Sequence, residues 1–89
     1  MRLDLFLKIS RLVKRRTLAK DYCDAGRIKI GGASAKPARE LKEGDQIALN
    51  LPRRKLVVEV VSLPKGNVSK ETAADLYRVI QEEKKQEDR

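Results

Sequence analysis

The spacing of apolar residues changes at Gly26, and this change does most to limit the folds open to the chain. Before Gly26, apolar residues recur every three or four positions, which is typical of helices that bury one face. The spacing predicts helices over residues 2–9 and 15–25, with buried stripes formed by Leu3, Phe6, Leu7, Leu18, Ala19, Tyr22 and Cys23. Gly26 would end the second helix as a left-handed cap.

After Gly26 apolar and polar residues alternate, which is typical of half-buried strands. Gly31-Gly32 is a hairpin signal, and the segment L-V-V-E-V-V has the strongest β-propensity in the chain. Strands are predicted over residues 27–30, 33–35, 46–51 and 55–63. The fold class is therefore α+β, with two N-terminal helices packed on a small, mainly antiparallel sheet.

The last part of the chain returns to helical spacing. Ser69 is a good N-cap, and the apolar residues that follow at i, i+3, i+4 and i+7 are Ala73, Leu76, Tyr77 and Ile80. This stripe predicts a C-terminal helix docked on the sheet, with a frayed, charged tail beyond Ile80. We expect a single domain, in which residues 1–63 form the body and 64–89 the helix and tail.

Positive charge is concentrated near the N-terminus. The chain has 21 Lys and Arg against 13 Asp and Glu, for a net charge of +8. Residues 1–30 hold nine basic and three acidic side chains, whereas residues 69–89 hold five and six. This asymmetry predicts a surface for a polyanion at one end of the molecule. Aromatic residues are only 3% of the chain, so recognition is expected to depend on phosphates and shape more than on stacked bases.

Catalytic and metal chemistry find little support in the composition. The chain has no histidine, and Cys23 is its only cysteine, so no Cys/His zinc site and no internal disulfide can form. No metal, cofactor or enzymatic activity is expected, and Cys23 is predicted to pack in the core. The N-terminus does not fit a signal peptide, and no apolar run is long enough to span a membrane. We expect a cytoplasmic protein.

The basic run R-L-V-K-R-R at 11–16 occupies the connection between the first two helices. Lys14, Arg15 and Arg16 stand where the start of a helix is already positive, a place that favours anions. Phosphate contact is therefore predicted for Arg2, Arg11, Lys14, Arg15, Arg16 and Lys20, with a possible extension through Lys8, Arg27, Lys29 and Lys36. A solvated basic face is the ordinary alternative. Asp4 could hold a neighbouring arginine, or serve only as an acid in the first helical turn.

Four segments in this order resemble the S-four RNA-binding domain, named after the small-subunit ribosomal protein. They are R-L-D-x-F-L-K at 2–8, R-R-T-L-A-K at 15–20, G-R-I-K-I at 26–30 and G-D-Q-I at 44–47. The resemblance covers about residues 1–51 and implies the small α+β (alpha-L) fold of that domain. The pattern is specific through the order and spacing of its parts.

Over its whole length the chain resembles the RqcP (YabO-type) family of bacterial ribosome-associated quality-control factors. The resemblance implies four partners. They are the obstructed large ribosomal subunit, its rRNA, peptidyl-tRNA and an RqcH/NEMF-type factor that adds alanine tails to the nascent chain. It also implies that Arg2 and Arg16 contact RNA. Two positions depart from the S-four pattern: Arg15 replaces the usual small capping residue, and Gly31 stands where Asn is usual.

Other functions remain open from the sequence. The chain could be a general translation or ribosome-assembly factor that binds rRNA or tRNA. A DNA-binding helix-turn-helix protein is less favoured, because Asp21 and Asp24 follow Lys20 on the exposed helical face and would repel DNA. An RNA-modifying enzyme is least favoured, because no catalytic domain follows the strands. We expect a monomer without a membrane partner.

Overall fold

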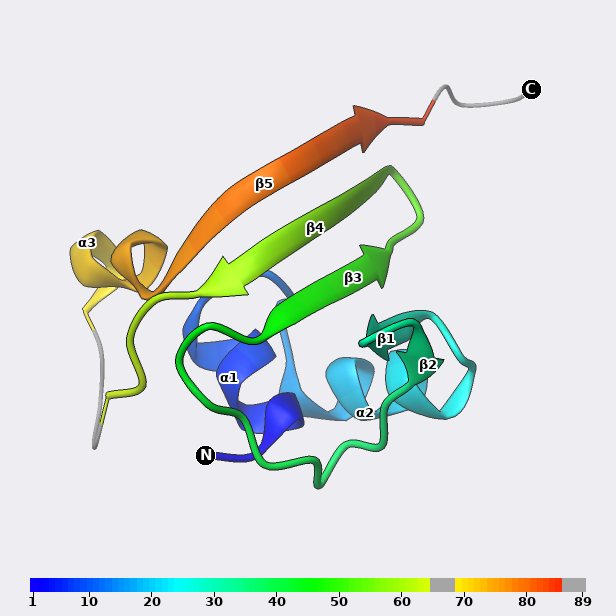
Figure 1. Ribbon diagram of the computed structural model, residues 1–89, viewed down its shortest axis with the longest axis horizontal. Helices are drawn as coiled ribbons and strands as arrows, with labels where there is room; N and C mark the ends of the chain where they lie inside the picture. Colours follow the sequence, from blue (N-terminus) through cyan, green and yellow to red (C-terminus); the bar gives the residue numbers. More distant parts are fainter. Residues whose placement is uncertain (65–68, 86–89) are drawn as a thin grey trace.

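The computed structural model describes residues 1–64 and 69–85. Its helices and strands follow one another in the order α1 (Leu3–Ile9), α2 (Arg16–Asp24), β1 (Ile28–Ile30), β2 (Ala33–Ser34), β3 (Gln46–Asn50), β4 (Arg54–Val60), α3 (Lys70–Ala73), the short 3₁₀ helix η1 (Ala74–Leu76) and β5 (Tyr77–Lys84). Both N-terminal helices and the strands β1 to β4 therefore form where the sequence predicts them, within a few residues at each end (Figure 1).

The strands form one sheet with the order β2-β1-β3-β4-β5, and all neighbours are antiparallel. A two-residue turn joins β1 to β2, in which Gly31 and Gly32 have φ angles of +63° and +82°. Two consecutive positive φ angles are what a hairpin turn of this length requires, and glycine adopts them without strain. The predicted antiparallel sheet and its first hairpin are confirmed.

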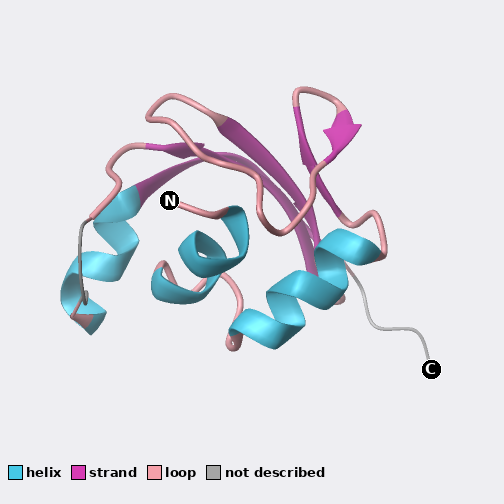
Figure 2. Cartoon of the chain, turned by 90° about the horizontal axis from the view of Figure 1, so that it is seen from below, coloured by secondary structure: helices cyan, strands magenta, loops and turns pink. Residues whose placement is uncertain are grey.

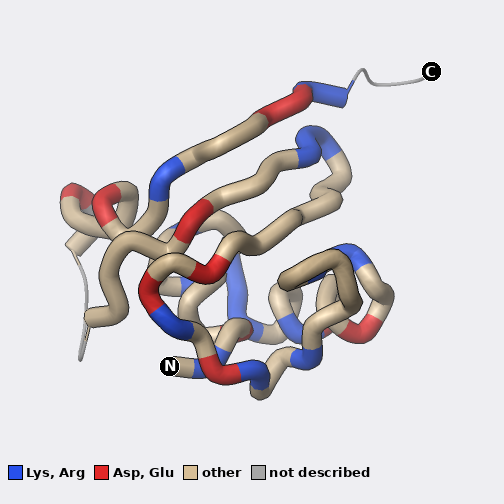
Figure 3. The backbone as a smooth tube through the Cα atoms, in the orientation of Figure 1, with Lys and Arg blue, Asp and Glu red and all other residues tan. Residues whose placement is uncertain are grey.

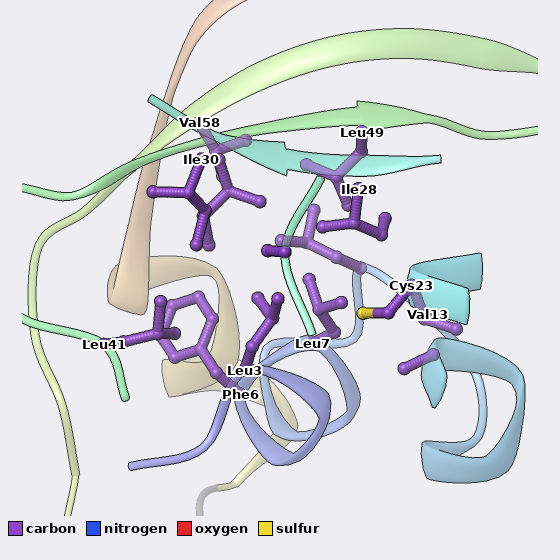
Figure 4. Packing of buried hydrophobic residues seen from close by; sticks show 14 of the residues in the cluster. Leu3, Phe6, Leu7, Val13, Cys23, Ile28, Ile30, Leu41, Leu49 and Val58 are labelled. Carbon is purple, nitrogen blue, oxygen red and sulfur yellow. The ribbon is translucent and has the colours of Figure 1, made fainter. Parts of the chain in front are cut away.

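The sheet curves over the helices, which lie on its concave side (Figure 2). Alternate residues of the strands point toward the helices and are buried, so the period of two in the sequence marks the core face. Side chains of α1 meet this face, as Figure 4 shows. The fully buried set includes Leu3, Phe6, Leu7, Ile28, Ile47, Leu49, Leu56, Val58 and Val60. Each such side chain stabilises the fold by about 1.5–3 kcal/mol relative to exposure.

The predicted C-terminal helix is wrong beyond Leu76. Ser69 does cap a helix, since its Oγ accepts a hydrogen bond from the Thr72 N–H at 3.3 Å, but α3 ends at Ala73. From Tyr77 the chain runs as β5 along β4, where Tyr77 lies opposite Val60. The predicted frayed segment after Ile80 is strand up to Lys84, and residues 86–89 of the predicted tail lie outside the described residues.

Pairing with β4 explains this error. Ala73 and Leu76 are buried as the helical stripe predicts, but Ile80 is 46% exposed. Without β5, the outer edge of β4 would expose its backbone N–H and C=O groups, whereas β5 pairs with this edge from Arg54 to Val60 with one register shift between Val57 and Val58. Helical spacing in the sequence cannot report this gain, because it comes from a strand far away in the chain.

Candidate RNA-binding site

Asp4 joins Arg2 and Arg16, which approach it from different segments of the chain. The Arg2 guanidinium donates from Nε to Asp4 Oδ1 at 3.2 Å and from Nη2 to Oδ2 at 3.1 Å. Arg16 Nε lies 3.4 Å from the same Oδ2. The Asp4 side chain is only 4% exposed, whereas those of Arg2 and Arg16 are 45% and 47% exposed. We call Arg2 and Arg16 the arginine pair.

The backbone around Asp4 fixes the position of its carboxylate. Asp4 lies in the first turn of α1, and its Oδ1 accepts the Leu5 N–H at 2.7 Å. The Leu3 and Asp4 N–H groups donate to the carbonyls of Arg39 and Pro37 at 2.8 and 3.0 Å. Asp4 therefore fills both roles that the sequence left open. It is a first-turn acid at the positive end of α1, and it orients two arginine side chains.

The connection between α1 and α2 exposes three further basic residues to solvent. Arg11, Lys14 and Arg15 are all exposed, and with Arg16 they form what we call the basic joint. Arg11 has a φ angle of +64°, a left-handed conformation that costs about 1–2 kcal/mol for a residue with a side chain. Helix α2 begins after Arg15 without a side-chain cap and without an acid in its first turn. Its positive N-terminus therefore adds to the charge of the joint.

Some of the other predicted residues are on the same helices as the arginine pair and the basic joint, and others lie on the sheet or in a loop. Lys20 is exposed on α2 one turn after Arg16, and Lys8 is exposed in the last turn of α1. Lys29 lies on the opposite face of the sheet from the helices, because its neighbours Ile28 and Ile30 are buried on the helical side. The Arg27 guanidinium donates to the Asn50 carbonyl at 3.2 Å. Lys36 is exposed in the loop after β2.

Two further basic residues lie next to the basic joint and are not marked by the sequence pattern. Arg53 lies in the turn between β3 and β4, Arg54 is the first residue of β4, and both line the same groove as Lys14. Figure 3 shows Lys and Arg at this turn as well as along the N-terminal helices. Pro52-Arg53-Arg54 lies between the predicted strands 46–51 and 55–63, and its separation from Lys14 along the chain gives no sign that the two line one groove.

Cys23 is buried in α2 at 5% exposure, as its position on the helical stripe predicts. Burial, with smaller contributions from the nearby carboxylates of Asp4 and Asp24, raises the pKa of the Cys23 thiol from its ordinary 9.0 to about 11. Such a thiol is a poor nucleophile at neutral pH. Within residues 1–64 and 69–85, no cluster of three His, Cys, Asp or Glu side chains is placed to bind a metal ion. No helix in these ranges has the length and apolarity needed to cross a bilayer.

Comparison with known families gives this geometry a context. Residues 1–47, which contain α1, the basic joint, α2, β1 and β2, match the S4 domain. A protein of Bacillus subtilis named RQC P-site tRNA stabilizing factor is 48% identical over 84 residues, covering 94% of this chain and 96% of the relative. The chain belongs to this S4-domain family. The Streptococcus pneumoniae protein of the same name is 44% identical over 87 residues, or 98% of each chain.

A solved structure extends the likeness to the sheet. Heat Shock Protein 15 of Vibrio cholerae, whose structure is described as trimeric, superposes with a TM-score of 0.82 at 28% identity. The match covers 89% of this chain and 80% of that protein. The S4-like fold predicted from the sequence is therefore confirmed. The family names describe stabilizing factors and no enzyme.

Proposed function

We propose that this protein binds RNA through the arginine pair and the basic joint, and that it acts on stalled large ribosomal subunits in ribosome-associated quality control. In this role it contacts large-subunit rRNA and stabilises the peptidyl-tRNA while an RqcH/NEMF-type factor adds alanine to the nascent chain. The relatives named RQC P-site tRNA stabilizing factor support this role. The protein acts as a non-enzymatic factor in the cytoplasm.

One observation carries the proposal at the level of residues. A buried carboxylate holds two guanidinium groups from separate segments, and each arginine side chain remains about half exposed. Arginine can form paired hydrogen bonds to phosphate oxygens, and it can also reach 2′-hydroxyls and base edges. Because Asp4 fixes the guanidinium groups before binding, less side-chain entropy is lost when RNA arrives. The arrangement suits recognition of a folded RNA by shape and phosphate position.

Sedimentation with purified large ribosomal subunits tests the proposal. We expect Arg2→Ala and Arg16→Ala each to abolish co-sedimentation. Thermal stability should change little, because Asp4 keeps the other arginine and the Leu5 N–H as partners. Arg78→Ala is the matched control, since it removes an equal charge from β5 at an exposed residue that pairs with Glu59.

Wild-type co-sedimentation of either arginine-pair variant would contradict the assignment of the site. An equal loss in Arg78→Ala would show that total charge, and not the arginine pair, governs binding. Reconstituted alanine tailing on stalled subunits gives a second readout, in which both arginine variants should reduce tail length. Normal tailing by both variants would overturn the proposed role in quality control.

The DNA-binding alternative is separated by competition. Asp21 and Asp24 are exposed on α2, and their carboxylates would face the phosphates if α2 entered a major groove. We therefore expect tRNA to displace the protein from labelled tRNA at concentrations where duplex DNA of equal length does not. A preference for DNA would rule out the RNA proposal.

A further inference from the structure

An open groove of about 450 Å³ lies beside the basic joint, between the α1–α2 connection, helix α2 and the β3–β4 turn. Its volume is within the roughly 300–1,000 Å³ of small-ligand sites. The apolar part of its lining comes from Leu12, Val13, Leu18, Tyr22, Leu51 and Pro52. Leu18 and Tyr22 are half-buried and pack against the core, so this floor is held by the fold.

Positive charge borders the groove on two sides. Lys14 comes from the basic joint, Arg53 from the β3–β4 turn and Arg54 from the first position of β4. Arg54 Nη1 lies 3.2 Å from Glu82 Oε2, which orients its guanidinium. No carboxylate occurs among the described lining residues. A complementary occupant therefore carries an apolar surface together with negative charge.

The groove continues the surface assigned to RNA. Lys14 belongs both to its rim and to the basic joint, and Arg16 of the arginine pair follows two residues later. A phosphate backbone that contacts Lys14 at the joint would therefore lie next to the groove. This continuity favours a nucleotide over an acidic peptide, although the two share the required chemistry.

We infer that the groove receives one unpaired nucleotide of the bound RNA, with its base against the apolar floor and its phosphate between Lys14 on one side and Arg53 and Arg54 on the other. The inference rests on the proposed RNA-binding function and adds Arg53 and Arg54 to the RNA-contacting surface. Low aromatic content argues against a row of stacked bases, but a single base needs only one apolar pocket.

Nuclear magnetic resonance of the full-length, isotope-labelled protein tests the site directly. Titration with adenosine or uridine 5′-monophosphate should shift signals of Leu18, Tyr22 and Leu51 at the floor. Ribose 5-phosphate, which lacks the base, should shift only signals near Lys14 and Arg53. Equal effects of the two ligand types, or no floor shifts at millimolar nucleotide, would overturn the inference. Preferential binding of an acidic, leucine-containing peptide would also overturn it.

A variant separates this inference from the proposed function. We expect Arg53→Glu to weaken tRNA affinity roughly tenfold at low salt, because a phosphate contact becomes a repulsion. Lys42→Glu makes the same charge change at an exposed residue outside the groove lining and should have a smaller effect. If Arg53→Glu binds like Lys42→Glu while Arg2→Ala abolishes binding, the groove is not a subsite and the proposed function stands. If Arg2→Ala retains wild-type binding, the proposed function itself fails.

Discussion

At the scale of single residues, the site depends on a balance between one buried acid and two exposed bases. Asp4 lowers the net charge of the surface that we propose binds RNA, so electrostatics alone would favour its loss. Its carboxylate instead fixes the orientation of Arg2 and Arg16. If Asp4 is replaced by a neutral residue, the loss of orientation therefore predicts weaker RNA binding, whereas the gain of positive charge predicts tighter binding.

We predict that Asp4→Asn weakens RNA binding although it makes the protein more positive. Releasing two arginine side chains adds about 1–3 kcal/mol of ordering entropy to the cost of binding, which corresponds to a loss of affinity of roughly fivefold to 150-fold. Filter binding with labelled tRNA measures this effect. Asp24→Asn, at an exposed acid of α2, is the control and should bind slightly more tightly. Tighter binding by Asp4→Asn would mean that Asp4 has no orienting role.

The pKa of Cys23 gives a second residue-scale prediction. The folded thiol stays protonated up to about pH 11, whereas the unfolded thiol loses its proton above 9.0. Between these values the unfolded state binds fewer protons, so the free energy of unfolding should fall by up to about 1.4 kcal/mol per pH unit. Cys23→Ala lacks this contribution. Urea unfolding at pH 8, 9 and 10 should therefore show that the difference in free energy of unfolding between the wild type and Cys23→Ala becomes smaller as the pH rises. A constant difference would contradict the raised pKa.

Part of the site could be predicted from residue types and spacing. The basic run before α2 and the S-four segments, which depend on local sequence alone, predicted Arg16 and Arg2 as site residues. The structure brings both to Asp4, and their contact with RNA stays a prediction. Arg53 was missed, because only the folded sheet brings the β3–β4 turn to the groove of Lys14. The positive φ angle of Arg11 could not be predicted from the sequence either, because glycine and asparagine are the usual residues in that conformation and neither occurs there.

At the scale of elements, the local sequence pattern predicted the right type of secondary structure wherever burial and propensity agreed. The stripes of α1 and α2 and the alternation in β1, β3 and β4 satisfy this condition. In β5 local propensity and tertiary pairing conflict. The segment Q-E-E-K at 81–84 has a high helix propensity, whereas the open edge of β4 pairs with a strand. Tertiary pairing overrides propensity there, which single-sequence reasoning could not foresee.

A substitution at Val79 distinguishes strand from helix by the sign of its effect. Val79 is 44% exposed in β5 and lies opposite Val58. In a strand, Val79→Ala should lower the free energy of unfolding by about 0.5–1 kcal/mol, whereas in a helix it should raise it by about 0.5 kcal/mol. Thr17→Ala, at an exposed residue of α2, is the helical control and should stabilise. Chemical denaturation measures both; stabilisation by Val79→Ala would contradict β5.

At the scale of the whole molecule, the open edges of the sheet bear on assembly. The strand β2 is a two-residue edge, and the pairing of β5 with β4 has a register shift next to Val57. The β5 edge also carries Arg78, Glu82, Glu83 and Lys84. Short edge strands, irregular pairing and charged side chains all hinder edge-to-edge association.

We therefore predict a monomer in solution. Sedimentation equilibrium at low and high protein concentration should give the mass of one chain throughout. The related Heat Shock Protein 15 of Vibrio cholerae has a structure described as trimeric, so a concentration-dependent rise toward three chains is the informative contrary result. Repeating the measurement with tRNA present would show whether RNA changes the assembly.

The carboxylate that Asp4 shares between two arginines limits which substitutions the chain can accept during evolution. Losing one arginine removes one of the two oriented guanidinium groups, although the Asp4 carboxylate keeps the other arginine and the Leu5 N–H. Losing the acid leaves two like charges close together without the carboxylate that orients them. Each single step is therefore worse than the starting point, so the three residues are expected to persist or disappear together as an inherited set.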